Sequence, residues 1–140
     1  VSCAAFFRGK RLMARICVVE DDEVTHSAVT RFLEFSNYEV VAYDDAEPAL
    51  AAEGRFERVD LILTDSSMPT PAGAILAALI DMKVKVPVIV MSGNFHQSDR
   101  DMYDRMGAVL LIDKPIGLDA LTQAVKSVLD EAAASPGTMG

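Results

Sequence analysis

Acidic, hydroxyl and basic residues follow four of the short apolar runs in this sequence. Glu20 to Asp22 follow the run 16–19, Asp65 follows 61–64, Ser92 follows 88–91, and Asp113 and Lys114 follow 109–112. Carboxylates gathered at one site repel one another, so such a group needs positive charge beside it. Lys114 supplies one charge, and a hard divalent cation is the natural second source.

The acidic residues have the pattern of a magnesium site. Mg²⁺ (or Mn²⁺) prefers oxygen ligands and is typically held by one or two carboxylates together with phosphate. Asp21 and Asp65 fit as direct ligands, and Glu20 fits as a ligand through water. A backbone carbonyl near Ser67 would add another oxygen.

The same residues suit phosphoryl transfer to an aspartate. A carboxylate can act as a nucleophile and form an aspartyl phosphate, and Asp65 is the candidate. Such a transfer depends on positioning and on neutralising the equatorial oxygens more than on an acid or base. The cation, Lys114 and the Ser92 hydroxyl can each take one of those oxygens, so no catalytic histidine is needed. His26 and His96 are expected to be solvated helix or loop residues.

Strands and helices must alternate five times to position these residues. We expect strands at 16–19, 40–43, 61–64, 88–91 and 109–112, and helices over about 24–36, 45–50, 75–80, 97–106 and 118–129. Asn37 and Gly54 are expected to end the first two helices, and Asp45 to cap the second. Four strands read as continuous apolar runs, which is typical of strands covered on both faces. The pattern predicts an α/β fold with a doubly wound parallel sheet and its site beyond the carboxyl ends of the strands.

Length and composition restrict the class of protein. The chain has 140 residues, 51% of them hydrophobic, which suits one domain with one core. Its formal net charge of −8 argues against a nucleic-acid interface, and no apolar run is long enough to cross a membrane. Cys17 lies in an apolar run and is expected to be a buried thiol, which favours a cytoplasmic protein. We expect a disordered extension at 1–13, the domain at 14–134 and a flexible tail at 135–140.

Five motifs in order resemble the receiver domain of two-component response regulators, the CheY-like superfamily. They are Val18-Val19-Glu20-Asp21-Asp22, Asp60 to Pro69 around Asp65, Gly73, Pro87 to Gly93 around Ser92, and Gly107-Ala108 followed by Lys114-Pro115. Each motif alone is weak, but their order and spacing over about 14–130 are specific. The resemblance implies the flavodoxin-like strand order 2-1-3-4-5 with five flanking helices, and a Lys-Pro bond that is commonly cis.

The family's roles transfer to matching positions of this chain. Asp65 resembles the phosphoacceptor, Glu20 and Asp21 the metal pair, Ser92 the switch hydroxyl and Lys114 the phosphoryl-sensing lysine. The resemblance implies phosphorylation by a phosphohistidine of a histidine kinase or phosphotransfer protein, and slow self-hydrolysis rather than turnover as an enzyme. The expected partners also include a downstream protein target.

The chain departs from the family pattern at positions that concern signal output. Leu111 stands where the family has its switch aromatic, and a leucine has no ring for the family's usual coupling between hydroxyl and aromatic side chain. Val109 and Leu110 replace residues that are usually polar, and Ala72 replaces a common acidic residue. We therefore expect an unusually apolar surface around the fifth strand and its flanking helices, which is a candidate docking or homodimer face.

Two other functions compete with the phosphorylation switch. A phosphorylation-independent pseudo-receiver would use the same fold as a protein-binding module; the altered position Leu111 favours it, and the complete acidic, hydroxyl and lysine set opposes it. A haloacid-dehalogenase-like phosphatase would need a second aspartate two residues after Asp65, where this chain has Ser67. Each candidate residue taken alone would more often be an ordinary loop or surface residue, so the interpretation depends on their convergence.

Overall fold

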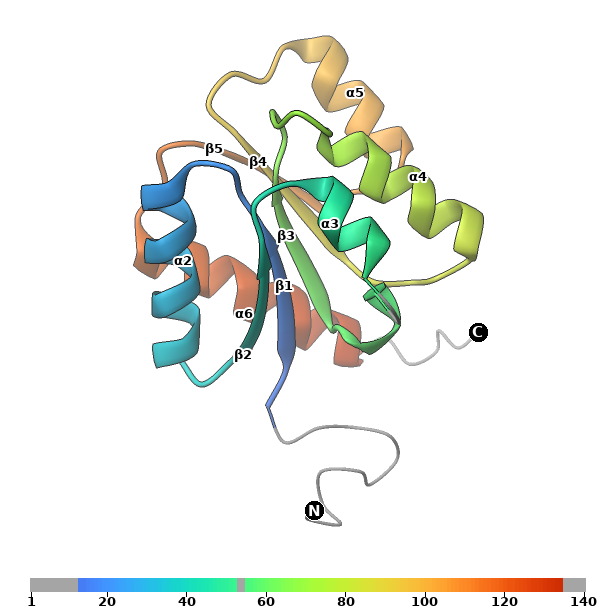
Figure 1. Ribbon diagram of the computed structural model, residues 1–140. Coiled ribbons are helices and arrows are strands. Elements are labelled where there is room, and N and C mark those ends of the chain that lie inside the picture. The colour runs from blue at the N-terminus through green and yellow to red at the C-terminus, as the bar shows by residue number, and fades with distance from the viewer. Residues whose placement is uncertain (1–12, 53–54, 135–140) are drawn as a thin grey trace.

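The computed structural model describes residues 13–52 and 55–134, in which strands and helices alternate along the chain (Figure 1). The strands are β1 (Arg15–Val19), β2 (Glu39–Tyr43), β3 (Leu61–Asp65), β4 (Val88–Ser92) and β5 (Leu110–Asp113). The α-helices are α2 (Glu23–Phe35), α3 (Ala46–Ala51), α4 (Ala72–Met82), α5 (Gln97–Arg105) and α6 (Leu118–Ala134). A short 3₁₀ turn, η2 (Arg55–Arg58), precedes β3 and was not predicted from the sequence.

All five strands are parallel and lie in the order β2-β1-β3-β4-β5. This order confirms the predicted doubly wound, flavodoxin-like sheet. Because the strands are parallel, their carboxyl ends meet at one edge, where the connections to α2, α3, α4 and α5 also begin (Figure 1). The predicted site residues lie at or just beyond this edge.

Two apolar clusters pack on opposite faces of the sheet. One joins alternate strand residues such as Val19, Ile62 and Val90 to side chains of α3, α4 and α5. The other joins Ile16 and Leu63 and their neighbours to α2 and α6. Side chains on alternate sides of β1, β3 and β4 therefore enter different clusters, which explains why these strands are continuously apolar. The thiol of Cys17 lies in the first cluster, and burial raises its pKa to about 12.

Local signals in the sequence begin and end the helices. The Asp22 side chain accepts a hydrogen bond from the Thr25 backbone N–H and caps α2, and Asp45 caps α3 in the same way. After α2, Asn37 adopts a left-handed conformation with φ 71°, as predicted. The predicted stop of α3 at Gly54 lies outside the described residues.

The fifth strand differs from its prediction. β5 is an edge strand, and Val109 and Leu110 at its start are 52% and 36% exposed. Only Ile112 of the strand is buried, so the apolar run 109–112 is not covered on both faces. The run was misread because an apolar sequence does not reveal which of its residues a helix will cover.

The predicted extension and tail fall almost entirely outside the described residues. Residues 1–12 and 135–140 are not part of the described structure, so the predicted extension, domain limits and tail stay predictions. Within the described residues, no helix has both the length and the apolar character needed to cross a membrane.

Candidate functional site

The acidic pair lies at the carboxyl end of β1. Glu20 follows the strand directly, and its backbone N–H donates to the carbonyl of Tyr43 at the end of β2 (3.1 Å). Its side chain is only 1% exposed, and its Oε2 accepts from the backbone N–H of Asp22 (3.2 Å). Asp21, the next residue, is exposed. One carboxylate of the pair is therefore buried and fixed, and the other faces solvent.

Asp65 ends β3 beside this pair and is 6% exposed. Lys114, which follows β5, reaches back across the sheet edge. Its Nζ lies 2.9 Å from Glu20 Oε1 and 3.0 Å from Asp65 Oδ1. One ammonium group therefore bridges two buried carboxylates that come from different strands, and this satisfies the need for positive charge that the sequence indicated.

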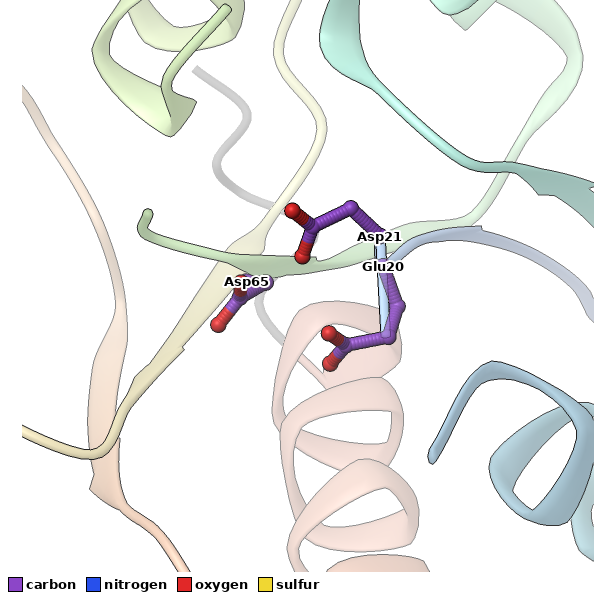
Figure 2. Close-up of side chains that lie close together, drawn as sticks. All are labelled: Glu20, Asp21 and Asp65. Atoms are coloured by element: carbon purple, nitrogen blue, oxygen red, sulfur yellow. The ribbon is translucent and has the colours of Figure 1, made fainter. Parts of the chain in front are cut away.

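Three carboxylates form a group of the size that a metal ion requires. One oxygen from each of Glu20, Asp21 and Asp65 lies within 4.8 Å of the others. Figure 2 shows the three side chains turned toward a common space, two from the end of β1 and one from the end of β3. The donor set is all oxygen and one member is open to solvent, which fits Mg²⁺ with several retained waters. Ser67 is exposed in the loop that follows Asp65, between β3 and α4.

The electrostatic state of the site follows from burial and from this bridge. Burial raises the pKa of Asp65 above its ordinary value; the hydrogen bond from Lys114 opposes the rise, and the charge of Glu20 adds to it. For Lys114, burial favours the neutral amine, but the bonds to Glu20 and Asp65 outweigh it and raise its pKa. The ammonium is therefore held charged, while Asp65 is a carboxylate that a cation would stabilise.

Ser92 and Lys114 are linked through the backbone. Ser92 ends β4, is 4% exposed, and pairs in register with Asp113 of β5. Its carbonyl accepts from the Lys114 backbone N–H (2.8 Å), and its Oγ accepts from the backbone N–H of Asn94 (3.1 Å). The bond between Lys114 and Pro115 is cis, as the resemblance implied. The structure thus places the hydroxyl and the ammonium at ends of neighbouring strands.

Two further contacts at this edge were not predicted from the sequence. His26, which was expected to be solvated, is partly buried, and its Nδ1 lies 2.9 Å from the carbonyl oxygen of Glu20. In α5, which follows β4, Arg100 contacts both oxygens of Asp113 (2.7 and 2.9 Å) and stacks over the ring of Phe95 (4.9 Å to the centroid). Only the position of His26 early in α2, directly after the acidic motif, hinted at the first contact.

Apolar surface adjoins the site on one side. A groove of about 320 Å³ runs between the start of α2 and the start of α6, past Lys114 and the residues after it. Val24, 78% exposed, lies on the α2 side of this groove, and Pro115 and Ile116 lie on the other. A protein surface that docked here would lie next to Asp65 and its neighbours.

Comparisons with known proteins agree on one family. The family model described as the response regulator receiver domain matches residues 16–126. ARR21 of Arabidopsis thaliana, a protein named for the two-component response regulators, is 33% identical over 120 residues, which are 84% of this chain and 19% of that protein. The chain therefore spans about a fifth of that relative.

Solved structures give the same result. A CheY-like response regulator receiver domain protein from Methanospirillum hungatei JF-1 is 26% identical with a TM-score of 0.81, over 88% of this chain and 98% of that chain. The phosphorylated cyanobacterial phytochrome response regulator RcpA is 26% identical with a TM-score of 0.69, over 83% of this chain and 91% of that chain.

Proposed function

Because this chain belongs to the response regulator receiver domain family, we propose that it is a Mg²⁺-dependent switch that is phosphorylated on Asp65. The observation that carries the proposal is the bridge from Lys114 to Glu20 and Asp65, beside an exposed Asp21. Burying two carboxylates that share one lysine costs free energy, and a module that only bound proteins would not need this arrangement. The phosphorylated state of RcpA, a structural neighbour, further supports this function.

The proposed reaction moves a phosphoryl group from a histidine to Asp65. A carboxylate oxygen of Asp65 attacks phosphorus in line, the O–P bond forms, and the N–P bond of the phosphohistidine breaks, with its electron pair left on the imidazole. Lys114 and the Ser92 hydroxyl donate to oxygens of the transferred group. Glu20, Asp21, Asp65 and the Ser67 carbonyl would hold Mg²⁺ or Mn²⁺, which supplies charge neutralisation.

The phosphoryl donor in this proposal is a histidine kinase or a histidine phosphotransfer protein in the cytoplasm. Docking in the groove lined by Val24, Pro115 and Ile116 would bring a donor histidine next to the site. The domain is not otherwise an enzyme. It accepts the phosphoryl group, and water then slowly hydrolyses the aspartyl phosphate. Ser67, two residues after Asp65, offers no carboxyl group for phosphatase chemistry.

We propose that the surface formed by β5 and its flanking helices transmits the signal by binding a protein target or a second copy of this chain. Ser92 Oγ is bonded to Asn94, the next residue is Phe95, and Arg100 ties Phe95 to Asp113 at the end of β5. This series of contacts joins the site to α5 without an aromatic ring at position 111. Leu111 instead packs against the core cluster that contains Tyr103.

Binding of Mg²⁺ and beryllofluoride, a phosphoryl mimic, tests the proposed function. We expect calorimetry to show Mg²⁺ binding by the wild type, and beryllofluoride binding only when Mg²⁺ is present. The Asp65→Asn variant should bind neither well. A wild type that bound neither ligand would instead be a pseudo-receiver that works through constitutive contacts.

A further inference from the structure

The loop that joins β3 to α4, residues 66–71, carries Ser67 and is hydrogen-bonded to neighbouring segments near both of its ends. At its start, the Ser66 backbone N–H donates to the carbonyl of Met91 in β4 (2.8 Å). Near its end, the Thr70 backbone N–H donates to Oδ1 of Asp45 (2.8 Å). The segment that bears Ser67 therefore lies between one hydrogen bond to β4 and one to Asp45.

Asp45 is itself fixed in place. Its Oδ2 accepts from the Glu47 backbone N–H (3.2 Å) at the start of α3, so each carboxylate oxygen has a separate partner. Burial opposes ionisation, but the bonds from Thr70 and Glu47 outweigh it and lower the pKa of Asp45. The acceptor is therefore ionised and makes strong, charge-assisted hydrogen bonds. Ala46 and Ala49 are fully buried, which fixes α3 against the sheet.

The strand end that precedes Asp45 contacts the other half of the site. The carbonyl of Tyr43, two residues before Asp45, accepts from the backbone N–H of Glu20 (3.1 Å). The end of β2 is thus bonded to the acidic pair through Tyr43, and the turn that follows it is bonded to the Ser67 loop through Asp45. The acidic pair and the Ser67 loop are the segments that must keep a constant separation to hold one metal ion.

We propose that Asp45 is a positioning residue of the metal site: through Thr70 it holds the loop that carries the Ser67 carbonyl at a fixed place relative to Glu20 and Asp21. Asp45 itself contacts neither the metal nor the phosphoryl group. The inference rests on the proposed function, because it concerns the same Mg²⁺ site. Groups of this kind, which orient metal ligands without being ligands, commonly change metal affinity when they are removed.

A serine at position 45 separates positioning from helix capping. Serine caps helices as well as aspartate does, but it has one oxygen, closer to the backbone, where aspartate bonds Glu47 and Thr70 through two separate oxygens. We therefore expect serine at this position to keep the cap and lose the bond to Thr70. We expect Asp45→Ser to raise the apparent Kd for Mg²⁺ about tenfold, at the low end for groups of this kind. The rate of phosphorylation by acetyl phosphate at saturating Mg²⁺ should stay near wild type. The urea-unfolding curve without metal should shift less than in Asp45→Ala, because the helix cap is kept.

Two other variants complete the experiment. Asp44→Ser removes the same charge one residue away, where the side chain is exposed, and should leave the Kd nearly unchanged. Asp45→Ala removes both the cap and the bond to Thr70, so it should move the urea-unfolding midpoint to lower urea and raise the Kd as much as Asp45→Ser does. A Kd for Asp45→Ser equal to that of Asp44→Ser would overturn the inference. A Mg²⁺ affinity that fell only in proportion to the free energy of unfolding across the three variants would overturn it as well. Absence of Mg²⁺ binding in the wild type would instead refute the proposed function.

Discussion

Lys114 and Glu20 are 94 residues apart in the sequence, yet their side chains form a 2.9 Å ion pair at the carboxyl edge of the sheet. The same ammonium lies 3.0 Å from Asp65, and both carboxylates are at least nine-tenths buried. A lysine in this position both neutralises the two buried carboxylates and faces the oxygen of Asp65 that would carry a phosphoryl group. The properties of the domain should therefore depend on Lys114 in two separable ways.

Replacing Lys114 by methionine should destabilise the metal-free protein. The change leaves Glu20 and Asp65 buried without a positive partner. Because the Lys114 side chain is 23% exposed, we expect the free energy of unfolding to fall by about 3 kcal/mol, the low end for such a change. Mg²⁺ should restore part of that loss, because it supplies the missing charge. Urea unfolding with and without Mg²⁺ measures both effects. Lys126→Met is the matched control: Lys126 pairs with Asp130 on the exposed face of α6, and its loss should change stability little.

Replacing Ser92 by alanine should affect phosphorylation but not metal binding. The hydroxyl is proposed to donate to the transferred group and is not a metal ligand. We expect the rate of phosphorylation by acetyl phosphate to fall roughly a hundredfold, the low end for removing one such donor, with the Kd for Mg²⁺ unchanged. Ser98→Ala, on the exposed side of α5, serves as control. An equal loss of metal affinity and rate would show that Ser92 acts on the metal site instead.

The raised pKa of Asp65 predicts how Mg²⁺ affinity changes with pH. The folded protein holds this proton more tightly than the unfolded chain does, because burial, together with the charge of Glu20, disfavours the carboxylate. The stability that this bound proton contributes to the folded state is fully present below the ordinary pKa of an aspartate. It is lost as the pH rises through the raised pKa of Asp65. Protons and Mg²⁺ compete for Asp65, so affinity should weaken on acidification at a higher pH than for an ordinary aspartate. Calorimetric titrations at several mildly acidic pH values test this, and an onset at the ordinary aspartate pKa would contradict it.

The exposed apolar residues at the start of β5 predict self-association in the phosphorylated state. Val109 is 52% exposed and Leu110 36%, and Met102 of the helix α5 is 36% exposed. If this surface is a homodimer face, light scattering should show a larger mass when Mg²⁺ and beryllofluoride are added. Val109→Asp should prevent the increase, whereas Val24→Asp, on exposed α2, should not. A monomeric mass with and without Mg²⁺ and beryllofluoride would contradict the homodimer, and the partner of this surface would then be a different protein.

The sequence was sufficient to place the main side chains of the site. Glu20, Asp65, Ser92 and Lys114 each end or follow an apolar run, and parallel strands bring such positions to one edge. Periodicity and caps located the helices to within a few residues, because signals such as Asp22 and Asn37 act locally. The fold and the proximity of the acidic residues were therefore predictable from short-range patterns and one topological rule.

The contacts that tune the site could not be predicted in this way. Asp45 and Thr70 are 25 residues apart, and nothing in either segment indicates that a carboxylate oxygen will meet that backbone N–H. The contact of His26 with the Glu20 carbonyl depends on the angle at which α2 leaves the sheet. The exposure of Leu110 depends on β5 being an edge strand. Each of these features is set by how elements pack, which the sequence of one element does not contain.

The most direct test of the central claim is the intact mass of the protein after incubation with acetyl phosphate and Mg²⁺. We predict a gain of one phosphoryl group, about 80 Da, that requires Mg²⁺ and is absent in Asp65→Asn. A gain that persisted in the Asp65→Asn variant would assign the modification to another residue. If the wild type gained no mass, and also bound neither Mg²⁺ nor beryllofluoride, Asp65 would not be a phosphoacceptor and the proposed switch function would be wrong.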